Sequence, residues 1–145
     1  MDITERIRKI LYELKLIKQD DYLIKTVYLF GSFAKGKYNE KSDIDLAFVF
    51  DKRFYKEDPF KALQEAELLG VKISNIINRA VDVIVLNSSS LSFAYNTIRQ
   101  GICVYESSSA DRILYEVAVD NKYQDFMPFI KELRDIKRRA LIGRD

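Results

Sequence analysis

Apolar residues recur at helical spacing along the first part of the chain. They occupy one face of residues 2–17, at Ile3, Ile7, Ile10, Leu11, Leu14 and Ile17, and this repeat is typical of an amphipathic helix. Asp2 followed by Glu5 resembles a capping box in which Asp replaces Ser or Thr. The pattern therefore predicts an N-terminal helix that begins near Asp2.

Four short apolar runs, each ended by polar residues or glycine, predict strands. They are TVYLF (26–30), IDLAFVF (44–50), VDVIVL (81–86) and ICVYE (102–106). Their length and their β-branched and aromatic content fit buried strands better than helices. Because no helical pattern separates the first run from the second, we expect a mixed sheet.

The remaining segments have helical periodicity. Asp58 and Pro59 suit the N-cap and the first position of a helix whose apolar stripe extends to Ala80. Residues 90–101 predict a short helix. Two helices are expected after the fourth strand, one that begins within 107–120 and a last one with the apolar stripe Phe126, Phe129, Ile130, Leu133, Ile136 and Ala140.

The order of these elements, α-β-β-α-β-α-β-α-α, predicts an α/β (α+β) fold in which helices flank a mixed sheet. The 145 residues are enough for one hydrophobic core. We therefore expect a single domain over residues 1–145, with a helical C-terminal end at about 109–141.

Composition narrows the possible chemistry. The chain has no His and one Cys, Cys103, which excludes Ser-His and Cys-His catalysis, His-ligated zinc and an internal disulfide. The net charge of +2 is too small to indicate nucleic-acid binding. No apolar stretch is long enough to span a membrane, and the charged N-terminus does not resemble a signal peptide, so we expect a cytosolic protein.

The segment LFGSFAKGKY carries most of a phosphate-binding P-loop, Gly31-x-x-x-x-Gly36-Lys37. Tyr38 stands where that motif needs Ser or Thr. A P-loop also leads into a long helix, whereas a short polar turn here leads directly into the second strand. We therefore interpret the segment as a different kind of phosphate-binding turn.

The residues of this turn suit a nucleoside triphosphate. Gly31 lets the backbone approach the phosphates closely. The Ser32 hydroxyl and the amides that follow can donate to the β and γ oxygens. Lys35 or Lys37 can neutralise the charge that develops on the leaving pyrophosphate.

Three carboxylates complete the pattern. Ten residues separate Ser32 from Asp43-Ile44-Asp45, at the start of the second strand, and strand alternation places the two acids on one face with Ile44 in the core. Asp82 joins them if its strand is the neighbour. Such carboxylates can hold two Mg²⁺ ions ~3.5–4 Å apart, the arrangement used for phosphoryl displacement. A single strand-end Asp is more often a solvated residue, but the combination favours nucleotidyl transfer.

The stretch FGSFAKGKYNEKSDIDLAFVF resembles the Gly-Ser, ten residues, Asp-x-Asp signature of the nucleotidyltransferase superfamily with the DNA polymerase β-like fold. The resemblance covers about residues 24–87 and implies a catalytic core at about 24–106. It implies that Gly31 and Ser32 bind the triphosphate, with Lys35 standing where Arg is frequent. It further implies that both metals bind Asp43 and Asp45, and that Asp82 binds one metal and helps deprotonate the attacking hydroxyl.

Within that superfamily the short chain resembles the minimal nucleotidyltransferases (MNT proteins), which are commonly antitoxins of HEPN-domain ribonuclease toxins. This resemblance implies Mg²⁺-dependent transfer of AMP from ATP to a tyrosine hydroxyl of a HEPN toxin. The partners it implies are the toxin and a nucleoside triphosphate, in a homo- or hetero-oligomer, with no membrane and no nucleic acid as direct substrate.

Two other functions stay open at this point. One is a non-catalytic antitoxin that neutralises its partner by contact, through a last helix whose basic side includes Lys131, Arg134 and Lys137. The other is a nucleotidyltransferase that acts on a small molecule or a tRNA end. The sequence leaves the acceptor, the preferred base and the oligomeric state undetermined.

Overall fold

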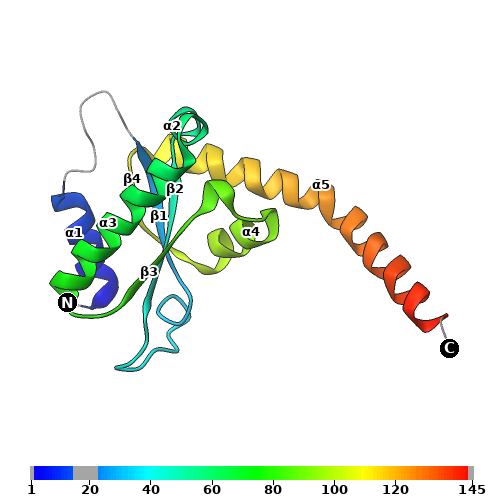
Figure 1. Ribbon diagram of the computed structural model, residues 1–145, viewed down its shortest axis with the longest axis horizontal. Helices are drawn as coiled ribbons and strands as arrows, with labels where there is room; N and C mark the ends of the chain where they lie inside the picture. Colours follow the sequence, from blue (N-terminus) through cyan, green and yellow to red (C-terminus); the bar gives the residue numbers. More distant parts are fainter. Residues whose placement is uncertain (1, 15–22, 144–145) are drawn as a thin grey trace.

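The computed structural model describes residues 2–14 and 23–143 and has a four-stranded sheet at its centre (Figure 1). β1 pairs antiparallel with both β2 and β4, whereas β2 and β3 are parallel, so the expected mixed sheet is confirmed. The strands lie in the order β3-β2-β1-β4, with the bounds β1 (Ile24–Phe30), β2 (Ile44–Phe50), β3 (Val81–Val85) and β4 (Ile102–Glu106).

Helices pack on both faces of this sheet. One core lies between the sheet and helices α1 and α3, where Ile7 and Ile73 pack with Leu46. The other lies between the sheet and helices α4 and α5, where Tyr95 and Val119 pack with strand residues. The helices are α1 (Ile3–Glu13), α2 (Lys52–Glu57), α3 (Pro59–Ile77), the 3-10 turn η1 (Leu86–Ser88), α4 (Leu91–Gln100) and α5 (Ser109–Ile142).

The expected helix caps are confirmed. The Asp2 carboxylate accepts the backbone N–H of Glu5 at 2.8 Å, and the Asp58 carboxylate accepts that of Lys61 at 3.0 Å. Each carboxylate satisfies an amide that has no partner inside its helix. Helix α1 ends at Glu13, and the expected position of Ile17 lies outside the described residues.

The structure differs from the sequence prediction in three helices. Helix α3 ends at Ile77 and does not extend to Ala80, because Asn78 adopts a left-handed conformation that closes the helix. Helix α2 was missed, because its six residues are too few to show a helical repeat; the Asp51 carboxylate caps it by accepting the amides of Arg53 and Phe54. The two helices expected after β4 form the single 34-residue helix α5, which continues through Pro128. Proline removes one helical hydrogen bond, and here that loss does not end the helix.

The C-terminal half of α5 extends away from the sheet and the other helices (Figure 1). Every described residue from 131 to 143 is exposed. Across the ranges 2–14 and 23–143, no helix combines the length and the apolar composition that are needed to cross a membrane.

Candidate active site

The acidic residues singled out in the sequence lie at one end of the neighbouring strands β2 and β3. Ile44 and Leu46 are fully buried, while Asp45 between them points to the opposite face, the one that α4 and α5 cover. Asp45 pairs in register with Asp82 of the parallel strand β3. Asp43 immediately precedes β2 and is exposed. The expected adjacency of the two acidic strands is therefore observed.

The three carboxylates interact electrostatically. Partial burial, then the negative charge of Asp82 and then that of Asp43 raise the pKa of the Asp45 carboxyl above its usual range. Within the described part of the chain, no three His, Cys, Asp or Glu side chains form a ready-made metal cage. Protein-bound Mg²⁺ generally uses one or two carboxylates and takes its other ligands from water and substrate phosphates. Paired carboxylates with unrelieved negative charge fit that requirement.

The Gly31-Ser32 turn lies directly against this acidic cluster. Gly31 has a φ of +72°, and a Cβ atom on it would lie 2.2 Å from Oδ2 of Asp45. No residue with a side chain fits there without displacing the carboxylate, so the glycine is required by the close approach as well as by its backbone conformation.

The turn after Gly31 is closed by its own backbone. The amide of Lys35 donates to the carbonyl of Gly31 at 3.2 Å, and the amide of Lys37 donates to that of Ser32 at 2.9 Å. These two amides are therefore engaged, and only the earlier amides of the turn suit the phosphate contact expected from the sequence. The chain then enters β2 without a long helix, which agrees with the rejection of the P-loop.

Arg79, which the sequence analysis missed, holds the loop that leads to Asp43. Its guanidinium donates to the backbone carbonyls of Asn39, Glu40 and Ser42 at 3.1, 3.1 and 3.2 Å. It also lies 5.3 Å from the centre of the Phe33 ring. No motif connects an arginine before the third strand with this loop, and only the tertiary structure reveals the contact.

The aromatic residue that replaces the P-loop hydroxyl has a structural partner. The ring of Tyr38 stacks on that of Phe33 with 4.4 Å between centroids. Phe33 is buried and belongs to the main core. Tyr38 therefore anchors the far end of the turn that begins at Gly31 to the body of the domain.

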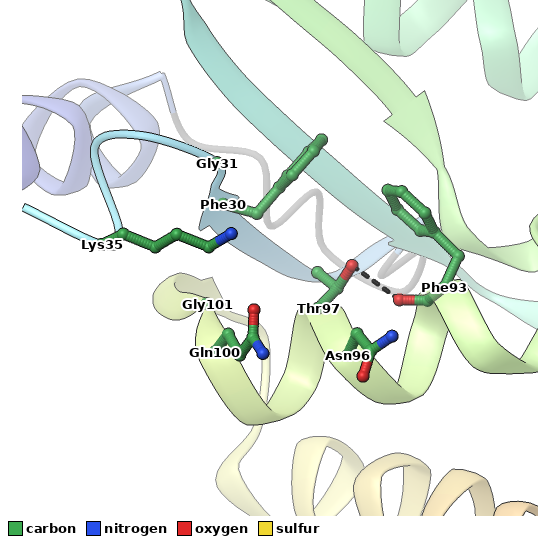
Figure 2. A pocket seen from close by; sticks show the side chains of 8 residues that line it. All are labelled: Phe30, Gly31, Lys35, Phe93, Asn96, Thr97, Gln100 and Gly101. Atoms are coloured by element: carbon green, nitrogen blue, oxygen red, sulfur yellow. Dashed lines mark hydrogen bonds between the residues drawn. The ribbon is translucent and has the colours of Figure 1, made fainter. Parts of the chain in front are cut away.

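Beside the turn lies a cavity of about 230 Å³ between the end of β1 and helix α4. Figure 2 shows the Lys35 side chain on one side of this cavity and the side chains of α4 on the other. Gly31 lines the cavity and also contacts the acidic cluster, so the two features adjoin. No local pattern marks the α4 residues, because their place at the cavity depends on how α4 packs.

Comparison with known proteins agrees with this geometry. A putative protein adenylyltransferase of Methanocaldococcus jannaschii is 33% identical over 84 residues, which cover 56% of this chain and 84% of that protein. The protein adenylyltransferase MntA of Aphanizomenon flos-aquae is 34% identical over 97 residues, which cover 64% of this chain and 63% of that protein.

Solved structures share the fold. A crystal structure of a toxin–antitoxin with AMP-PNP matches with a TM-score of 0.64 and 23% identity, over 91% of this chain and 98% of that one. A complex of tri-AMPylated Shewanella oneidensis HEPN toxin with MNT antitoxin matches with a TM-score of 0.59 and 20% identity, over 94% and 99%. The family model for "Polymerase beta, Nucleotidyltransferase" matches residues 9–110, which is more than half of the chain. The chain therefore belongs to the polymerase β nucleotidyltransferase family.

Proposed function

We propose that this chain is a Mg²⁺-dependent adenylyltransferase that transfers AMP from ATP to a tyrosine hydroxyl of a HEPN-domain toxin and so acts as its antitoxin. The observation that carries the proposal is the in-register pair Asp45 and Asp82 directly beside the Gly31 turn. Relatives that are named protein adenylyltransferases, and fold neighbours solved as toxin–antitoxin complexes, support it.

Asp43, Asp45 and Asp82 are the residues to which we assign the binding of two Mg²⁺ ions. Mg²⁺ held by these residues would neutralise phosphate charge and so favour an in-line displacement at the α-phosphorus. Partial burial and then the repulsion among these carboxylates raise the pKa of Asp45, and binding a cation would offset the repulsion.

The remaining residues position ATP and the acceptor. Ser32 and the early amides of the turn bind the β and γ phosphates, and Lys35 balances the charge of the departing pyrophosphate. The acceptor oxygen forms a bond to the α-phosphorus while the bond from that phosphorus to the bridging α-β oxygen breaks. The hydroxyl proton passes to the carboxylate of Asp82. Holding the reactants in this geometry supplies much of the rate enhancement.

Helix α5 favours a protein as the acceptor over a small molecule. The part of α5 that leaves the body carries exposed apolar residues at alternating spacings of three and four, Phe126 (51% exposed), Phe129 (59%), Leu133 (50%) and Ile136 (52%). Contiguous exposed apolar surface of this kind marks sites of protein–protein contact, and this spacing is the one that packs against another helix.

The same surface supports a second candidate function, a non-catalytic antitoxin that silences its toxin by contact alone. The two functions make different demands on the acidic cluster. Catalysis requires it, whereas contact through α5 does not.

The test of the proposal uses the full chain, Mg²⁺, ATP labelled at the α-phosphate, and a purified HEPN-domain toxin. We expect label to appear on the toxin and to be lost in the double variant Asp43→Asn/Asp45→Asn. The matched control Glu65→Gln/Glu67→Gln, which removes two acids from α3, should transfer label normally. If the unaltered chain transfers no label but both it and the Asp43→Asn/Asp45→Asn variant bind and silence the toxin, the chain is a binding antitoxin and the catalytic proposal is wrong.

A further inference from the structure

The cavity beside Gly31 has walls of two different kinds. The rings of Phe30 and Phe93 pack edge to face with 5.6 Å between centroids and form an apolar side. Asn96 and Gln100 line the cavity from helix α4, one turn apart, and Lys35 lines it from the turn (Figure 2). An aromatic surface next to neutral amides suits a flat, polar-edged ring, while Lys35 belongs to the turn where the phosphates are proposed to bind.

The polar side chains that line the cavity differ in how far the fold itself engages them. The Thr97 hydroxyl donates to the carbonyl of Phe93 at 2.8 Å, so it is engaged within its own helix. The side chains of Asn96 and Gln100 are exposed. Phe93 is also 38% exposed, although its ring is apolar. Helix α4 therefore presents a ring and two carboxamides to whatever enters the cavity.

The position and size of the cavity indicate which part of a nucleotide it takes. At about 230 Å³ it is smaller than the usual 300–1,000 Å³ of a pocket that encloses a whole small-molecule ligand. It shares Gly31 with the acidic cluster, so a ligand with its phosphates at the Gly31-Ser32 turn extends naturally into it. The cavity therefore fits the end of the nucleotide that is remote from the phosphates.

We propose that this cavity receives the adenine base of ATP, with Phe93 as the stacking surface and the amides of Asn96 and Gln100 as the groups that select the base. The inference rests on the proposed nucleotidyl transfer and assigns its base specificity to α4. A carboxamide offers one donor and one acceptor, which matches the N6 and N7 groups of adenine, whereas guanine presents two acceptors at O6 and N7. The site therefore prefers ATP to GTP.

The experiment measures binding to the full chain in Mg²⁺ by calorimetry, with ATP, GTP and inorganic tripolyphosphate as separate ligands. Stacking of a base on an aromatic ring predicts that Phe93→Ala weakens ATP binding by about five- to hundredfold and leaves tripolyphosphate binding unchanged. Phe93→Leu keeps an apolar side chain without the aromatic face and should show the same selective loss. Phe60→Ala, which truncates an exposed ring on α3 (67% exposed), is the matched control and should bind all three ligands normally.

Variants of the amides test base selection. Asn96→Ala and Gln100→Ala together should reduce the preference for ATP over GTP to near unity, again with tripolyphosphate unaffected. Unchanged ATP affinity in both Phe93 variants would overturn the inference, and so would an equal loss of ATP and tripolyphosphate binding. If the Phe93 variants bind ATP normally but no longer transfer AMP to the toxin, the cavity receives the tyrosine ring of the acceptor and the inference about the base is wrong.

Failure of the proposed function gives a different result. If the unaltered chain binds neither ATP nor tripolyphosphate in Mg²⁺, the nucleotidyl-transfer site is wrong and the base pocket falls with it. A different outcome would refute the base pocket alone. In that case Asp43→Asn/Asp45→Asn loses tripolyphosphate binding, which supports the transfer site, but Phe93→Ala leaves ATP binding unchanged.

Discussion

The close contact between Gly31 and Asp45 gives the sharpest prediction about catalysis. In Gly31→Ala the new Cβ would lie 2.2 Å from Oδ2 of Asp45 and 3.2 Å from its Cγ. Ordinary contact begins at about 3.4 Å, so the carboxylate or the turn must move by roughly 1 Å. Displacements of that size at a reacting centre can lower the rate about 10²-fold. The positive φ adds about 1–2 kcal/mol of backbone strain.

Gly36 provides a matched control in the same turn. Its φ is +69°, and a Cβ on it would meet nothing within 4 Å. Gly36→Ala therefore incurs the same backbone strain of about 1–2 kcal/mol without moving Asp45. We expect both variants to lose stability in thermal unfolding, and Gly31→Ala to lose more because of its clash with Asp45, while only Gly31→Ala loses AMP transfer about 10²-fold.

Both variants are assayed for label transfer from ATP and for thermal unfolding. Equal transfer by Gly31→Ala and Gly36→Ala would refute the reasoning, because it would mean that displacement of Asp45 does not matter. An intact rate in Gly31→Ala would have the same consequence.

Three further predictions concern stability and loop position. The pKa of Asp45 is raised in the folded state, so the stability that its protonated form contributes is present at low pH and is lost as the pH rises through that pKa. In EDTA, Asp45→Asn should therefore have a higher melting temperature than the unaltered chain at pH 7 and lose this advantage near pH 4. Equal melting temperatures at pH 7 would contradict this prediction. The Asn87 amide accepts the N–H of Phe50 at 2.9 Å and donates to its carbonyl at 3.0 Å, so Asn87→Ala should lower the free energy of unfolding by about 1–3 kcal/mol in urea. Arg79→Ala should lower it by only about 0.5–1.5 kcal/mol, because two of the three hydrogen bonds of Arg79 are exposed to water. It should also reduce AMP transfer, with partial rescue by Arg79→Lys; normal transfer would show that the loop needs no such support.

The strands and the acidic cluster could be predicted because their signals are local. Alternation around Ile44 determines which face Asp45 occupies, and a run of apolar residues is sufficient to place Asp82 on a strand. The helix caps at Asp2 and Asp58 were equally readable, since a cap depends on residues three positions apart.

The features that the sequence did not predict depend on tertiary contacts or on whether a helix tolerates the hydrogen bond that one proline removes. Pro128 usually ends a helix, but α5 continues through it. The contacts of Arg79 join it to residues about forty positions earlier. Phe93 is near the turn only because α4 packs beside the end of β1. Residues that form a site through such distant contacts leave no fixed spacing to recognise.

We propose that the three aspartates and the Gly31-Ser32 turn form one metal- and triphosphate-binding site. The most direct measurement is a crystal structure of the full chain with Mn²⁺ and a non-hydrolysable ATP analogue, using the anomalous signal to locate the metal. We predict Mn²⁺ bound by Asp43, Asp45 and Asp82, with the triphosphate against Gly31 and Ser32. A nucleotide bound elsewhere, or one bound at the turn with no metal at these carboxylates, would contradict the account.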